Sequence, residues 1–143
     1  MAIIQGTCDS FRTELLSGVH AFGTDVIKIA LYDADTAAIT PAITTAYTST
    51  GEIVSSGYTA GGIILTGVTV LGAPAVGYVV WDATTWTLPF LPGIDGALIY
   101  NASKSNKAIA VLNFGTTRYP NSDGVFTLQY PYDPINNAVI RLA

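Results

Sequence analysis

The sequence contains little charge, one cysteine and one histidine. Charged residues make up 11% of the 143 residues, against about 25% in a typical soluble domain. This scarcity excludes a charge-rich disordered chain, a coiled coil and a basic nucleic-acid binder. The net charge of −4 at pH 7 also disfavours non-specific binding to a polyanion. So few charges on a small domain suggest that partners cover part of its surface.

The single cysteine, Cys8, excludes an intrachain disulfide, and alone it cannot supply the ligand set of a metal site. We expect Cys8 to be a small buried apolar residue. The N-terminus lacks the basic segment of a signal peptide. The longest apolar stretch, residues 63–80, is interrupted by glycines and a proline, so it does not supply the roughly 20 residues of a membrane span. We therefore expect a chain made in the cytoplasm, with no membrane partner.

The sequence offers few residues for catalysis. A Ser-His-Asp or Cys-His site would have to use His20, and no Gly-x-Ser-x-Gly turn is present, so we expect His20 not to be catalytic. Asp33 and Asp35 could hold calcium or act as an acid–base pair, but a solvated turn is the simpler interpretation. The glycines of residues 57–62 lack the lysine of a phosphate-binding loop. We predict a protein that is not an enzyme and has no cofactor or metal.

Apolar residues at helical spacing predict one helix, from Asp9 to about residue 22. Phe11, Leu15, Val19 and Phe22 form its stripe, and Gly23 suits the position just past its end. We expect this stripe to pack on a sheet as part of the core.

From residue 26 to residue 142 the pattern changes to short strands with alternating apolar residues. The expected strands lie near residues 26–32, 63–71, 77–81, 86–91, 97–100, 108–114, 125–130 and 138–142. Asp95-Gly96 and Asp123-Gly124 are dipeptides typical of hairpin turns. The sequence therefore predicts a single domain over residues 1–143, mainly β, in an antiparallel β-sandwich (jelly-roll-like) with one N-terminal α-helix.

Aromatic and apolar residues between prolines mark a candidate contact surface. Pro89-Phe-Leu-Pro92 cannot form a regular central strand, and on a loop Phe90 and Leu91 would be exposed, as at many protein contacts. Trp and Tyr also anchor interfaces. The predicted interface residues are Trp86, Phe90, Leu91, Tyr119 and Tyr132. Packing and oligomer contact is the simpler role for these rings, and stacking on a glycan is the alternative.

Several segments resemble small virion structural proteins of tailed bacteriophages: the first 20 residues, Ile27–Tyr32, Thr44–Tyr47, Gly57–Gly62, Gly96–Lys107 and Asn137–Ala143. The resemblance runs along most of the chain and rests on turn and strand residues. It implies a capsid decoration or cement protein, located in the virion and contacting copies of itself and other capsid or tail proteins. A homotrimer is expected from shell symmetry. The alternative is a tail-associated or receptor-binding component.

Overall fold

The computed structural model describes residues 2–131 and 133–143, and its central element is the long hairpin of β7 (Ile94–Asn101) and β8 (Lys107–Arg118). The hairpin belongs to a five-stranded sheet of order β1-β8-β7-β2-β3, in which β1 is Gly6–Thr7, β2 is Ile27–Tyr32 and β3 is Ile63–Ile64. All pairings in this sheet are antiparallel. Residues 102–106 form the turn of the hairpin.

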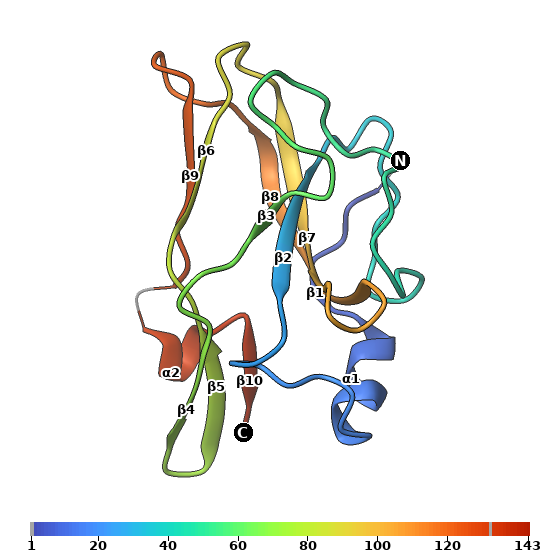
Figure 1. The fold of residues 1–143 in the computed structure, drawn as a ribbon, viewed down its shortest axis with the longest axis vertical. Helices are drawn as coiled ribbons and strands as arrows, with labels where there is room; N and C mark the ends of the chain where they lie inside the picture. The colour runs from blue at the N-terminus through green and yellow to red at the C-terminus, as the bar shows by residue number, and fades with distance from the viewer. Residues whose placement is uncertain (1, 132) are drawn as a thin grey trace.

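Two smaller antiparallel sheets accompany the five-stranded one (Figure 1). The first has the order β10-β5-β4, with β4 at Thr69–Ala73, β5 at Val76–Val80 and β10 at Ile140–Leu142. The second pairs β6 (Thr84–Thr87) with β9 (Val125–Leu128). A short helix, α2 (Pro134–Asn137), precedes β10. The molecule is therefore mainly antiparallel β in a sandwich-like arrangement, with an N-terminal helix, as predicted.

The N-terminal helix is shorter than the sequence pattern predicts. Helix α1 spans Asp9–Leu16, not residues 9–22, and ends where Gly18 adopts a left-handed conformation with φ of 75°. The stripe survives in part, because Phe11 is buried and Leu15 and Phe22 pack against the core. Val19 and Phe22 lie beyond the helix, in a segment that folds back beside it. Their spacing matched a helix because a single glycine can redirect a chain without disturbing an apolar pattern.

The core lies on the central strands of the five-stranded sheet. Strands β2, β7 and the first half of β8 are almost entirely buried, which follows from their near-continuous apolar sequence. Asp95-Gly96 lies inside β7 and is not a hairpin turn, so that prediction was wrong. A side chain at Gly96 would collide with the Leu112 carbonyl and with Ile3, so this glycine serves close packing. Asp123-Gly124 does lie in a turn, between β8 and β9.

Residues 33 to 61, which are poor in large apolar residues, are ordered around the carboxylate of Glu52. Its two oxygens accept hydrogen bonds from the hydroxyls of Tyr47 (2.5 Å) and Tyr58 (2.6 Å) and from the backbone N–H of Gly61 (2.7 Å). The Tyr58 hydroxyl also accepts a bond from the N–H of Leu31 in β2. Burial and the adjacent Glu52 raise the pKa of both tyrosines. The Glu52 carboxylate thus ties three parts of this loop to one another, while backbone bonds such as Ile53 N–H to the Leu31 carbonyl (3.0 Å) join the loop to the sheet.

Candidate interaction surface

Phe90 and Leu91 lie at one end of the molecule, on the loop between β6 and β7 (Figure 1). Phe90 is 78% exposed and Leu91 is 41% exposed. The preceding Leu88 is fully buried, and its N–H donates to the carbonyl of Gly124 at 2.6 Å. The N–H of Leu91 closes the turn on the carbonyl of Leu88 at 3.0 Å. An anchored leucine therefore holds two apolar side chains out in solvent.

Tyr119 lies beside this loop and is 64% exposed. Its ring atoms are 3.4 and 3.7 Å from the point where a Cβ on Gly93 would lie. The ring thus rests against the end of the loop that carries Phe90 and Leu91. We call these three side chains, Phe90, Leu91 and Tyr119, the tip. The structure thus places Tyr119 beside Gly93, two residues after Leu91 in the sequence.

One of the predicted interface residues, Trp86, does not join the tip. Trp86 is 5% exposed, and its ring packs against Phe126 at 5.9 Å between ring centres. It occupies an inward position of β6, where Thr84 and Trp86 are buried and Thr85 and Thr87 are exposed. Trp86 therefore belongs to the core and cannot contact a partner directly. Tyr132 lies outside the described residues.

A polar hollow of about 560 Å³ borders the tip, with Tyr119 in its wall. Asp33, Asp35 and Asp95 line it, but Asp95 is fully engaged with the Ala34 N–H (2.8 Å) and the Thr117 hydroxyl (2.6 Å). Asp33 accepts from the Asp35 N–H at 2.8 Å in a local turn. Over the residues that the structure describes, no group of three His, Cys, Asp or Glu side chains is placed to hold a metal ion. The aspartates mainly organise the turn, as the simpler interpretation predicts.

His20 is enclosed in a polar cluster with no solvent-exposed side-chain surface. Its Nδ1 lies 3.0 Å from the Asn101 amide nitrogen, which also donates to Asp25 at 2.8 Å. Nδ1 is therefore the acceptor, and the ring proton is on Nε2, which lies 3.5 Å from the Glu14 carboxylate. Burial lowers the pKa of His20, against the attraction of Glu14.

The Glu14 carboxylate connects His20 to a lysine. Lys107 pairs with Glu14 at 3.5 Å on its other side. The arrangement fits a structural link between the segment after α1 and the β7–β8 turn.

Cys8 is fully buried, as predicted, and burial together with Asp9 and Glu14 raises the pKa of its thiol to about 12. A thiol with that pKa is not a nucleophile at neutral pH.

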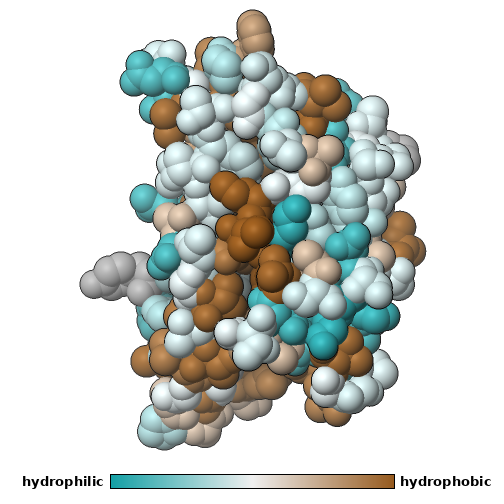
Figure 2. All heavy atoms as spheres, in the orientation of Figure 1, coloured by the Kyte–Doolittle hydropathy of each residue, from teal (hydrophilic) through white to brown (hydrophobic). Residues whose placement is uncertain are grey.

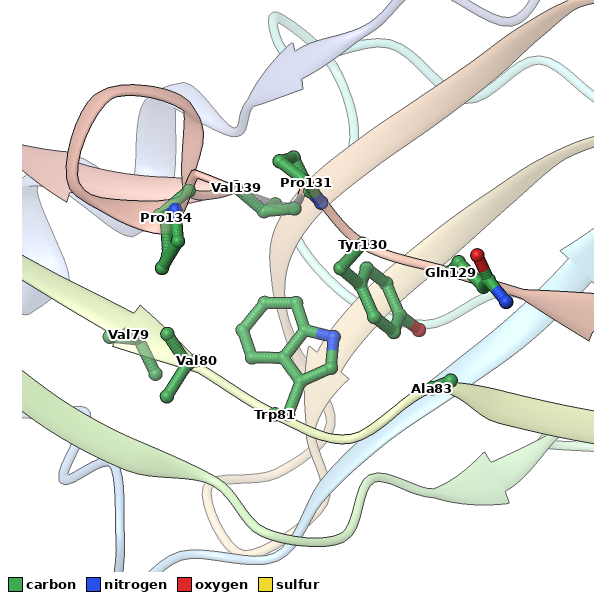
Figure 3. A pocket seen from close by; sticks show the side chains of 10 residues that line it. Val79, Val80, Trp81, Ala83, Gln129, Tyr130, Pro131, Pro134 and Val139 are labelled. Atoms are coloured by element: carbon green, nitrogen blue, oxygen red, sulfur yellow. The ribbon is translucent and has the colours of Figure 1, made fainter.

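A second hollow, of about 340 Å³, lies between β5 and the segment before β10 (Figure 3). Its walls are Trp81, Tyr130, Pro131, Pro134 and Val139, with Gln129 at the edge. The indole nitrogen of Trp81 points toward the ring of Tyr130 in Figure 3, and the two rings meet edge to face at 5.2 Å. The indole ring thus packs against Tyr130, while its buried Nε1–H has no hydrogen-bond partner among the described residues. The described residues that line this hollow are mostly apolar, and none of them is charged.

A third feature was missed by sequence reasoning: an apolar surface along residues 63–73. Ile63, Ile64, Val70 and Leu71 are exposed on strands β3 and β4. Figure 2 shows apolar side chains over the middle of this face and over the β4–β5 hairpin below it. The sequence signal for this surface was the absence of any charged residue from position 53 to position 81, the stretch that contains both strands. We call the side chains of Ile63, Ile64, Val70 and Leu71 the edge patch.

Comparisons with protein-family models, with curated proteins and with solved structures found no match to this chain. Among the described residues, no helix is long and apolar enough to cross a membrane.

Proposed function

We propose that this protein is a non-enzymatic structural component of a tailed-phage virion, most simply a decoration or cement protein that stabilises the assembled particle. The observation that carries the proposal is the tip, where Phe90, Leu91 and Tyr119 are exposed on an anchored loop. An apolar group of this kind usually marks a protein contact. The resemblance of the chain to small virion proteins supports the placement in a virion.

The magnitude of such a contact suits a cement. Burying a phenylalanine or leucine side chain completely contributes about 1.5–3 kcal/mol. Two such side chains are too few for a tight single interface, which buries about 1,600 Å² in total. Repeated over many positions of a shell, however, modest contacts add up through multivalency. The protein would hold neighbouring subunits together by covering apolar surface on them.

Substitution at the tip tests this proposal. Phe90→Asp should abolish binding of the purified chain to particles that lack it, measured by co-sedimentation, while the thermal midpoint stays within a few degrees. Leu16→Asp is the matched control, because Leu16 is also almost fully exposed but lies on α1, far from the tip in Figure 1. Unchanged particle binding by Phe90→Asp would refute the role of the tip. Unfolding of that variant would show that Phe90 belongs to the core.

A tail-associated or receptor-binding component is the second candidate. The observation that favours it is the exposed Tyr119 ring in the wall of the polar hollow, where a sugar could stack on the ring and meet the Asp35 carboxylate. Quantitative mass spectrometry of virions separates the two. A copy number close to that of the major shell protein supports the cement, whereas a much smaller number supports the tail component.

A further inference from the structure

Residues 63–73 follow the open edges of two sheets in succession. Strand β3 is the last strand of the five-stranded sheet, and β4 is the last strand of the three-stranded sheet. No described strand pairs with the outer side of either. Residues 69–72 are all exposed, although Val70 and Leu71 point to opposite faces of the strand. Strand β4 thus has exposed side chains on both faces, and no described strand pairs with its outer edge.

Strand β3 is only two residues long, but the outer edge of β4 lacks the features that natural proteins use to prevent edge-to-edge pairing. Such edges usually carry lysines, prolines or bulges, or are very short. Residues 63–73 contain no charged residue and no proline, and the β4–β5 register runs without a shift over all five residues of β4. Val70 is 56% exposed and Leu71 is 41% exposed. The β4–β5 hairpin also projects beyond the body of the molecule in Figure 1, where a partner could reach it.

We propose that β4 pairs with β4 of a second copy of this chain, antiparallel about a two-fold axis at Leu71. The two three-stranded sheets then become one continuous six-stranded sheet. The inference rests on the part of the proposed function in which copies of this chain contact one another.

Backbone geometry selects this register. In an antiparallel ladder, residues alternate between pairs that exchange backbone hydrogen bonds and pairs that do not. Ala73 and Val76 close the two-residue turn of the hairpin as a bonded pair, so Val70 and Gly72 direct their N–H and C=O groups outward. A two-fold axis at Leu71 places Val70 opposite Gly72 of the other copy. All outward groups of β4 then find partners, and all five residues of the strand are paired.

Side-chain size and charge also favour a second copy. In this register Thr69 lies opposite Ala73, and Val70 lies opposite a glycine, so no two bulky side chains collide except the two Leu71 side chains, which pack together. The nearest charge in the same row is Arg141, which is in register with Tyr78 and through it with Leu71. The two Arg141 residues would be five strand spacings apart, about 24 Å. That exceeds the screening length of about 8–10 Å, so repulsion between them is small.

A two-fold contact predicts dimers, whereas the expectation from shell symmetry is a trimer. The two are compatible when trimers form through another surface, because β4 edges would then join one trimer to the next. For the free chain, the β4 contact alone predicts a weak dimer, since five residues of strand bury far less than a standard interface.

Disulfide trapping tests the contact and its register together. Residues directly opposite in a non-bonded antiparallel pair have Cα atoms about 4.5 Å apart, within the range of a disulfide. Leu71→Cys should therefore give a cross-linked dimer under mild oxidation. Thr69→Cys, on the same strand, is the matched control, because its two copies would lie about 14 Å apart along the strands and should not cross-link. The native Cys8 does not interfere, because it is fully buried.

A second measurement does not depend on cysteine chemistry. Leu71→Lys places two like charges opposite each other and should weaken self-association, measured by sedimentation equilibrium, by at least about tenfold, equivalent to about 1.4 kcal/mol. Val54→Lys makes a matched substitution at an almost fully exposed loop residue and should leave self-association unchanged. Equal cross-linking of Leu71→Cys and Thr69→Cys, or equal self-association of the two lysine variants, would overturn the inference.

These results are independent of the particle-binding assay. Failure of Leu71→Cys to cross-link, with particle binding retained, refutes the edge contact and leaves the virion role standing. Cross-linking at Leu71 without any affinity for particles supports the edge contact and refutes the virion role.

Discussion

Replacing Glu52 with alanine removes the carboxylate that accepts three hydrogen bonds within the long loop of residues 33–61. The wild-type carboxylate binds the hydroxyls of Tyr47 and Tyr58 and the N–H of Gly61, at 2.5 to 2.7 Å. Glu52→Ala would leave all three donors without this partner. Because the sites are partly buried, water can replace the carboxylate only in part.

The expected loss of stability follows from these three bonds. A hydrogen bond to a charged group contributes about 1.5–3 kcal/mol, so three bonds set an upper bound of about 4.5–9 kcal/mol. The tyrosine hydroxyls can turn toward water, and the bonds are not additive. We therefore expect Glu52→Ala to lower the free energy of unfolding by about 3–5 kcal/mol. A domain has about 5–15 kcal/mol in total, so the variant should be folded but marginal.

Urea unfolding, followed by tryptophan fluorescence, measures this loss. Asp35→Ala is the control, because Asp35 is exposed in the same loop and should change stability by less than about 0.5 kcal/mol. Tyr47→Phe should cost about 1–2 kcal/mol in the wild type and almost nothing in the Glu52→Ala background, since its partner is then absent. A loss below about 1 kcal/mol for Glu52→Ala, or an equal cost of Tyr47→Phe in both backgrounds, would refute the account.

Three further predictions concern the core and the buried polar cluster. Burial lowers the pKa of His20 in the folded chain. The contribution of neutral His20 to stability is therefore complete above the unfolded pKa of about 6.5, and it is lost as the pH falls toward the folded pKa. Urea midpoints should be lower at pH 5.5 than at pH 8, and His20→Gln should remove this difference while leaving assembly intact. Cys8, with a pKa of about 12, should react with a thiol reagent only after unfolding, so rapid labelling of the native chain would contradict its burial. Leu15→Ala should lower the free energy of unfolding by about 1–2 kcal/mol, less than the loss of about 2–5 kcal/mol expected for a fully buried leucine, because Leu15 is only half-buried. Thermal melting measures this loss, and an unchanged midpoint would contradict the packing of Leu15 on the core.

Most of the fold could be predicted from local patterns in the sequence. The alternating apolar pattern of residues 26–32 correctly predicted strand β2, and the dipeptide Asp123-Gly124 correctly predicted a turn. The errors arose where one residue overrides a pattern. Gly18 ends α1 early, and Gly96 lies within a strand because Ile3 and Leu112 approach it closely. Neither approach is visible until segments distant in sequence are brought together.

The candidate surface was predicted unevenly, for the same reason. Prolines on both sides of Phe90 and Leu91 correctly indicated a loop with exposed apolar side chains. Trp86 was misassigned because its residue type favours interfaces, although Thr84, Trp86 and Leu88 alternate with exposed residues as an inward-facing row does. The charge-free stretch of residues 53–81 was the only sequence signal of the edge patch, and it was not enough, because no local pattern shows that β3 and β4 are the outermost strands of their sheets.

The distribution of charge connects the interior of the protein to its proposed contacts. Of only sixteen charged residues, six basic and ten acidic, Glu14 and Asp25 are 15% and 9% exposed in their side chains, and Glu52 is enclosed by tyrosines. Three of the sixteen charged groups therefore act mainly inside the fold and contribute little to its outer surface. Charged groups that fix loops from within cannot also protect a strand edge from pairing. The β4 edge lies within the charge-free stretch of residues 53–81, so association between copies of the chain meets little electrostatic repulsion there.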